Sequence, residues 1–334
     1  MSADTRPAFQ LKKPDLGRWR SGNTGIEGIW RFEAPEPGPD VLVTALVHGN
    51  ELCGAWAVLA ALEAELRPRR GSLTLGFCNV RAFDRFDPAA PDDSRYVDQD
   101  LNRLWGEMRW KYDGVAAFTV EQRRVLELRP IVERSDWLLD LHSMHEPGPP
   151  TLLTGLAPRN VLLARELGVP ELVVIDAGHR EGRRMRDHGR FADLAENGTR
   201  SLLIECGYHG DLRSRDVALD ILGRFLEVSG CVESGDVPPL WRQPEPARQQ
   251  VLEVTAAVTA LDGDAGFAEP WQSGQCIPLR GTLLGWNGGQ RFATPYDNCT
   301  LVMPSLRHAH PGATIVRLAR PAAGTGPGMA GQSS

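Results

Sequence analysis

Four side chains that could bind a metal ion or act on water stand where apolar segments end. His48 and Glu51 follow the apolar run 41–47 and lie three residues apart, so an imidazole nitrogen and a carboxylate can converge on one ion. His142 and Glu205 each end another apolar run. Two imidazoles and one carboxylate form the ligand set of catalytic zinc sites that keep a fourth position open for water. The pattern therefore indicates a zinc site with a second glutamate close by.

A histidine at a strand end can also be a buried residue that is satisfied by ordinary hydrogen bonds. No single member of this group is therefore specific. The combination is more specific, because a His-x-x-Glu pair is followed about ninety residues later by one histidine, and a further glutamate comes after it. Asp140 precedes His142 by two residues, so both side chains share one face of a strand. Asp140 either orients the metal ligand or has a structural role.

The elements that must position these side chains are buried strands that alternate with helices. The run 41–47 reads as a strand buried on both faces, and the Ala- and Leu-rich segment 52–66 after it reads as a helix. The same pattern predicts further strands over 72–80, 137–143, 151–156, 171–176 and 201–207, and further helices over 118–134, 158–167 and 215–227. Such alternation predicts an α/β fold with a mainly parallel or mixed sheet and helices on both faces. Sheets of this kind bind ligands at the carboxyl ends of their strands.

Chain length and composition predict two domains. A chain of 334 residues exceeds the size at which a single core keeps growing. We expect a catalytic α/β domain over 1–235 and a small β-rich domain over 236–320, because prolines at 238, 239, 244 and 246 mark a connector. The segment 321–334 is composed largely of Gly, Ala, Pro and Ser, and it is expected to be a disordered tail.

Charge and composition exclude several classes of partner. The formal net charge of -6 disfavours nucleic acid and anionic membranes. No apolar run is long enough to span a membrane, and the N-terminus lacks the pattern of a secretory signal, so we expect a cytoplasmic protein. The six cysteines contain no Cys-x-x-Cys pair, which favours free buried thiols over disulfides or a cysteine zinc site.

Four short motifs together resemble the succinylglutamate desuccinylase/aspartoacylase family, a branch of the zinc carboxypeptidase-like fold. They are His-Gly-Asn-Glu at 48–51, Asp-Leu-Asn-Arg at 100–103, Asp-Leu-His-Ser at 140–143 and Ile-Glu at 204–205. The resemblance spans about residues 40–230, and the β-rich end of the chain resembles the C-terminal domain of that family. It implies that His48, Glu51 and His142 bind one Zn²⁺ and that Glu205 is the general base.

The same resemblance implies roles for four further residues. Arg81 follows Asn-Val, where the family has Asn-Pro, and would polarise the carbonyl of the bond to be cleaved. Asn102 and Arg103 would bind a substrate carboxylate, for which a guanidinium fork is well suited. The alternative for Arg103 is a salt bridge to Asp98 or Asp100. Tyr296 resembles the residue with which the C-terminal domain reaches the substrate.

These predictions converge on a zinc-dependent amidohydrolase that removes the acyl group from a small N-acyl amino acid. The substrate would carry a carboxylate, and the sequence is compatible with a homo-oligomer. The alternatives are a metallocarboxypeptidase that acts on short peptides and, further away, a non-catalytic metal-binding module. A biotin- or lipoyl-type carrier is disfavoured, because no lysine follows Lys111. The chain also lacks a Gly-x-Ser-x-Gly elbow and a phosphate-binding loop.

Overall fold

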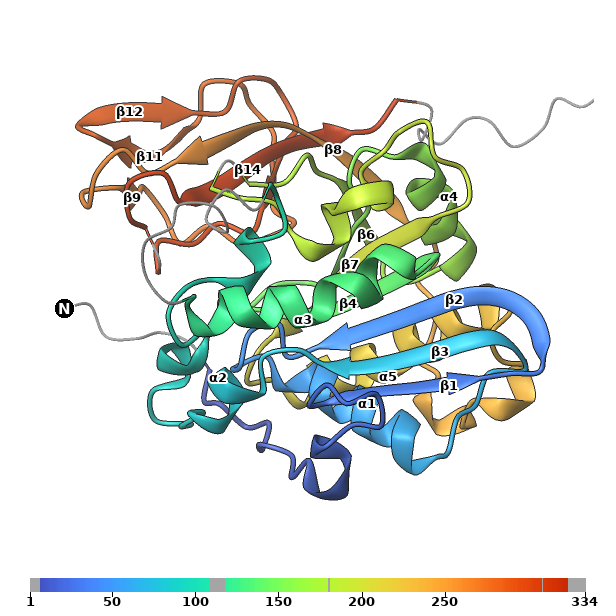
Figure 1. Ribbon diagram of the computed structural model, residues 1–334. Helices are drawn as coiled ribbons and strands as arrows, with labels where there is room; N and C mark the ends of the chain where they lie inside the picture. The colour runs from blue at the N-terminus through green and yellow to red at the C-terminus, as the bar shows by residue number, and fades with distance from the viewer. Residues whose placement is uncertain (1–6, 108–117, 180, 308, 324–334) are drawn as a thin grey trace, which may run out of the picture.

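A computed structural model describes residues 7–107, 118–179, 181–307 and 309–323. An 11-stranded mixed sheet runs through the described part of the chain, in the order β1-β3-β2-β4-β7-β5-β6-β8-β14-β13-β10 (Figure 1). Its strands are β1 (Ile29–Glu33), β2 (Glu36–Ala45), β3 (Arg70–Phe77), β4 (Trp137–Met144), β5 (Thr151–Leu153), β6 (Leu172–Ile175), β7 (Arg200–Tyr208), β8 (Gln250–Thr259), β10 (Cys276–Ile277), β13 (Cys299–Val302) and β14 (Thr314–Pro321). A 3-stranded sheet has the order β12-β11-β9, with β9 at Gly266–Phe267, β11 at Leu283–Asn287 and β12 at Gln290–Ala293.

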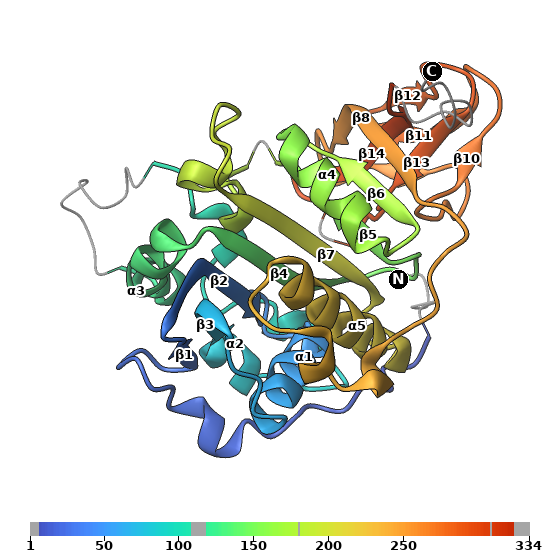
Figure 2. The same ribbon diagram turned by 90° about the vertical axis from the view of Figure 1, so that its right-hand side faces the viewer.

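Helices cover both faces of the large sheet, as the sequence predicted. They are α1 (Leu52–Glu63), α2 (Val80–Asp84), α3 (Val120–Arg134), α4 (Pro158–Leu167) and α5 (Leu212–Val228). α1, α4 and α5 contribute to one apolar core, whereas Val125, Leu128 and Val132 of α3 belong to a separate core. Figure 2 shows α3 on one side of strands β1 to β4, and α1 and α5 on the other. The predicted α/β class with a mixed sheet is therefore confirmed.

The β-rich end of the chain continues the large sheet. β8 pairs in parallel with β6 of the preceding segment and antiparallel with β14. The strands from β8 onwards also enclose an apolar core of their own, which includes Ile277, Leu301 and Ile315. The division into a catalytic domain and a β-rich domain at residue 235 stays a prediction. The expected tail falls mostly on residues 324–334, which lie outside the described part of the chain.

All six cysteines are free thiols, and five of them are buried, while Cys276 is exposed. The expected free state is therefore confirmed, whereas the expected burial is confirmed for all but Cys276. Among the described residues, no helix combines the length and the apolar character needed to cross a membrane.

Candidate metal centre and active site

The predicted ligands meet because three neighbouring strands end at one edge of the sheet. β2, β4 and β7 lie side by side and run in parallel, with Thr44 opposite Asp140 and His142 opposite Glu205. The apolar residues of these strands are buried between the helical layers, so the chain becomes polar only where the strands end. The turn after β2 then delivers His48 and Glu51 to the same place.

Gly49 lets this turn pack tightly. A Cβ atom at this position would lie 2.4 Å from backbone atoms of Ala82, Phe83 and Ser94. No side chain fits into that space, so glycine is required between the two predicted ligands.

Glu51 lies between the two imidazoles. Its Oε1 is 2.7 Å from Nδ1 of His48, and its Oε2 is 2.7 Å from Nδ1 of His142. One ligand atom from each of the three residues falls within 4.8 Å of the others, and all three side chains are buried. Three converging N and O donors of this kind match the protein ligands of a catalytic zinc site.

The other nitrogen of each imidazole contacts a carboxylate. Nε2 of His48 is 2.9 Å from Oδ1 of Asp100, and Nε2 of His142 is 2.9 Å from Oδ2 of Asp140. Asp140 is fixed in turn, because its Oδ1 accepts a hydrogen bond of 2.7 Å from Thr44 Oγ1. Metal-binding histidines are commonly oriented by such carboxylates, which leave Nδ1 free to coordinate.

The electrostatics of the group also fit a cation. Burial alone would raise the pKa of Glu51, but His48 and His142 hold it well below its usual value. Burial would lower the pKa of His142, yet Asp140 and Glu51 raise it well above its usual value. Burial and the charge of Glu51 raise the pKa of Glu205 to about 7. The carboxylates of Glu51 and Glu205 thus face the two imidazoles, and a divalent cation bound among them would supply the positive charge that the ionised carboxylates favour.

Glu205 provides a further observation that the residues fit a metal-dependent site. Its Oε2 is buried and has no hydrogen-bond partner among the described residues, although the side chain lines the cavity beside His48 and His142. A buried carboxylate oxygen without a partner is costly, and a ligand or water molecule at this position would satisfy it.

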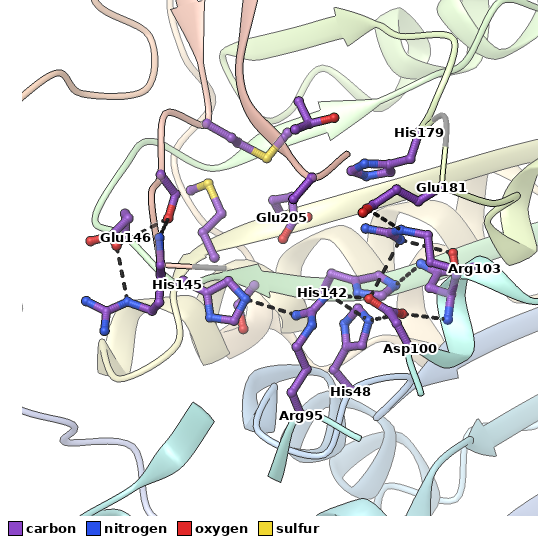
Figure 3. Close-up of a pocket in the computed structure, with 18 of the residues that line it drawn as sticks. His48, Arg95, Asp100, Arg103, His142, His145, Glu146, His179, Glu181 and Glu205 are labelled. Atoms are coloured by element: carbon purple, nitrogen blue, oxygen red, sulfur yellow. Dashed lines mark hydrogen bonds and ion pairs between the residues drawn. The ribbon is translucent and has the colours of Figure 1, made fainter. Parts of the chain in front are cut away.

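The site opens into a cavity of about 770 Å³ (Figure 3). The β-rich end of the chain forms part of its wall, with Trp271, Ser273, Met303 and Arg317 among the lining residues. His145 also lines the cavity.

Arg81 does not reach the cavity, contrary to the sequence-based prediction. It lies on α2, its side chain is exposed, and it is not among the lining residues. The strand before it ends at Phe77, and the Asn79 side chain accepts a hydrogen bond from the backbone N–H of Ala82 and so caps the new helix. This helical turn directs Arg81 away from the strand edge.

Arg95, which no sequence motif identified, contacts the metal-binding group instead. Its Nη1 is 3.4 Å from Oε1 of Glu51, and its Nη2 is 3.0 Å from Oδ2 of Asp100. Burial opposes its charge, but Asp100 and Glu51 raise the pKa of Arg95 overall. The signal that could have identified it is its place in the long polar segment 81–100, eight residues before Arg103.

Asn102 and Arg103 both line the cavity. The Asn102 side chain lies 3.4 Å from Nε2 of His142, and its Oδ1 accepts a hydrogen bond of 2.8 Å from the backbone N–H of Met185. Arg103 is 3.8 Å from Asp100 and 3.9 Å from Glu181, so neither carboxylate forms a close ion pair with it. Burial lowers the pKa of Arg103, because the guanidinium has lost water without gaining a close anion. A substrate carboxylate bound beside it would supply that anion.

Tyr296 does not line the cavity either, contrary to the expectation that this residue of the β-rich end reaches the substrate. Its side chain packs with the apolar core of the β-rich end, and its hydroxyl lies 2.7 Å from Oγ1 of Thr255. Arg317, on β14, lines the cavity from this part of the chain and pairs with Asp176 at 3.3 Å.

Fold and site together define an α/β protein with a His–Glu–His group that could hold a metal at the carboxyl edge of its sheet. Residues 37–169 match the model of the succinylglutamate desuccinylase/aspartoacylase catalytic domain. The resemblance of the sequence motifs is therefore confirmed. No curated protein sequence matches the chain.

Solved structures show the same fold. Succinylglutamate desuccinylase from Vibrio parahaemolyticus is similar, with 16% identity, a TM-score of 0.60, and coverage of 88% of this chain and 86% of that one. A succinylglutamate desuccinylase/aspartoacylase from Rhodobacter sphaeroides has 20% identity, a TM-score of 0.61, and coverage of 89% and 90%. The product-bound ectoine utilization protein EutE from Ruegeria pomeroyi has 16% identity, a TM-score of 0.56, and coverage of 87% of each chain.

Proposed function

We propose that the protein is a zinc-dependent amidohydrolase that removes the acyl group from a small N-acyl amino acid. The observation that carries this proposal is the convergence of His48, Glu51 and His142 beside the unpartnered oxygen of Glu205. His48, Glu51 and His142 would hold the metal. When bound there, zinc supplies a Lewis acid that polarises a carbonyl and acidifies water.

The protein's own residues divide the remaining work. Arg103 and Asn102 bind the carboxylate of the amino acid, because Arg103 is half-buried and its nearest carboxylates are 3.8 and 3.9 Å away. Arg95 lies beside Glu51 and donates to the carbonyl oxygen, where negative charge develops during attack. Glu205 takes a proton from water and passes it to the leaving nitrogen. The products are a free amino acid and a carboxylic acid.

The cavity wall favours small substrates over peptides. Trp271, Met303 and Arg317 of the β-rich end line the cavity that holds the proposed ligands. A carboxypeptidase acting on longer peptides needs an open side for the rest of the chain, and these residues restrict that space. The cytoplasmic location and a homo-oligomeric state stay predictions.

A Glu205→Gln variant tests the proposal. With zinc-loaded protein and a panel of N-acetyl, N-succinyl and N-formyl amino acids, we expect the native protein to release amino acid and the variant to lose at least ~100-fold in kcat, since general acid–base catalysis contributes about 10²- to 10⁴-fold. Glu36→Gln is the matched control, because Glu36 is exposed at the opposite end of β2. Unchanged turnover in the Glu205 variant would overturn the mechanism.

A further inference from the structure

The cavity beside the proposed metal centre has an apolar wall next to Glu205. From its chemistry, we infer that the acyl group of the substrate is an uncharged apolar chain of several carbons. This inference rests on the proposed amidohydrolase function and specifies its substrate class. We define the apolar wall by the five lining residues Met144, Leu153, Leu203, Trp271 and Met303.

The sheet places this apolar wall directly beside Glu205. Leu203 precedes Glu205 by two residues on β7, so both side chains lie on the same face of the sheet. Leu153 on β5 is the register partner of Leu203. Met303 packs against the apolar cluster that contains both leucines. The part of the cavity floor that adjoins the proposed base is thus hydrocarbon.

Met303 is held in this wall by an unusual backbone conformation. Its φ is +48°, in the left-handed region that residues other than glycine rarely adopt. The backbone N–H of Met303 donates a hydrogen bond of 3.1 Å to Oγ of Ser273, which also lines the cavity. Such conformations persist where the surrounding structure enforces them, and they are frequent at ligand-binding positions. Here the strained residue, Met303 in the turn after β13, is the one whose apolar side chain lines the cavity.

The methionine end of the apolar wall, Met144 and Met303, lies across the metal-binding group from Arg103. Figure 3 shows Arg103 on one side of His142 and Glu205, and His145 and Glu146 on the other. Met144 directly precedes His145 in the chain. Met303 lies two residues before Ser305, whose hydroxyl is 3.4 Å from Oε1 of Glu146.

In an N-acyl amino acid, the carboxylate and the acyl chain leave the amide bond in opposite directions. A substrate whose carboxylate binds Arg103 and whose carbonyl faces the metal ligands therefore directs its acyl chain toward Met144 and Met303. The cavity volume of about 770 Å³ falls within the range of about 300–1,000 Å³ that is typical of small-molecule pockets. An acetyl group would leave much of this space unfilled.

The cations on the acyl side already have carboxylate partners. Arg307 is 3.2 Å from Glu146 and 3.5 Å from Asp92. Arg95 pairs with Asp100 at 3.0 Å and reaches Glu51 at 3.4 Å. A succinyl carboxylate on this side would therefore lose its bound water without gaining an available cation, which costs free energy. Transfer of an alkyl chain from water to the apolar wall is instead favourable.

A substrate series tests this inference. The zinc-loaded protein is assayed with the N-acetyl, N-butyryl, N-hexanoyl and N-succinyl derivatives of L-alanine and of L-glutamate. Each added methylene that is buried corresponds to about a fourfold gain in kcat/KM. We expect kcat/KM for the N-hexanoyl compounds to be at least tenfold higher than for the N-acetyl compounds. Their advantage in kcat/KM over the N-succinyl compounds should be larger still.

The wall itself is tested with Met303→Gly. Glycine removes the side chain and suits a φ of +48°, so the variant keeps the turn without the strain. We expect the ratio of kcat/KM for N-hexanoyl over N-acetyl substrate to fall at least fivefold. Leu240→Ala is the control, because Leu240 is 94% exposed and lies outside the cavity lining, and its ratio should match that of the native protein.

The outcomes separate the two proposals. Hydrolysis that prefers N-acetyl or N-succinyl compounds over N-hexanoyl compounds would overturn the apolar acyl group and leave the amidohydrolase intact. An unchanged ratio in Met303→Gly would also overturn it. If zinc-loaded protein hydrolyses no compound of either series, both the amidohydrolase and its acyl specificity are wrong.

Discussion

The carboxylate of Glu51 contacts Nδ1 of His48 and Nδ1 of His142 at the same distance of 2.7 Å, one oxygen to each ring. His48 and Glu51 lie in the turn after β2, and His142 lies near the end of β4. The parallel pairing of β2 and β4 brings the three side chains together. The same atoms that approach one another here are the donors that a metal ion would share.

Asp140 should strengthen metal binding without touching the metal, because it contacts Nε2 of His142 at 2.9 Å. We expect Asp140→Asn to weaken zinc affinity about 10- to 100-fold, as is typical when a carboxylate behind a metal-binding histidine is lost. Competition with a chromophoric chelator measures the affinity. Asp264→Asn, at an exposed position, is the control. Equal affinity in Asp140→Asn and the native protein would contradict the role of Asp140.

Substitution of Arg95 should lower kcat strongly, whereas substitution of Arg81 should leave kcat nearly unchanged. Arg95→Lys should lower kcat about 10²- to 10³-fold, because a lysine cannot reproduce the guanidinium contacts with Glu51 and Asp100 and a lost oxyanion donor has effects of this size. Arg81→Lys should leave kcat within about twofold, because Arg81 is exposed and does not line the cavity. Steady-state kinetics on both variants decide between the two arginines. A larger loss in Arg81→Lys would restore the sequence-based prediction.

Zinc should stabilise the folded protein, because the three ligands converge only in the native state. At a free zinc concentration 1,000 times the dissociation constant, we expect a gain of about 4 kcal/mol in the free energy of unfolding and a higher Tm than in chelator. Thermal unfolding followed by circular dichroism measures the shift. In His142→Ala, zinc should raise Tm much less. An equal shift in that variant would indicate that the ion binds elsewhere.

Gly49 should contribute strongly to the stability of the folded protein. A Cβ in Gly49→Ala would lie 2.4 Å from the backbone of Ala82 and Phe83, so the turn must move, and we expect a loss of more than about 2 kcal/mol. Gly263→Ala is the control, since a Cβ there meets nothing within 4 Å. Urea unfolding gives both values. A Gly49→Ala protein as stable as the native one would show that the turn has more room than described.

The sequence predicted the metal-binding group because its signal is local. Each of the runs before His48, His142 and Glu205 is apolar enough to be a buried strand, and parallel strands end at the same edge of a sheet. The α/β class follows from the same periodicity. The sequence could not show that β8 pairs with β6 and extends the large sheet, since strand order depends on long-range packing.

The two failed assignments, Arg81 and Tyr296, depend on loops whose course is set by distant contacts. The path from Arg81 to Asp100 is fixed partly by Glu121, whose carboxylate accepts hydrogen bonds from the backbone N–H groups of Val97 and Asp98. Those contacts position Arg95 in the cavity, and nothing near Arg81 in the sequence indicates them. Tyr296 is likewise held by Thr255, 41 residues earlier in the chain.

The central claim is that His48, Glu51 and His142 bind one zinc ion. Anomalous diffraction from zinc-loaded crystals at the zinc absorption edge tests it most directly. We predict one strong anomalous peak per chain, in contact with Nδ1 of both histidines and with the Glu51 carboxylate. A peak at any other group of residues, or no peak at these three side chains, would contradict the account.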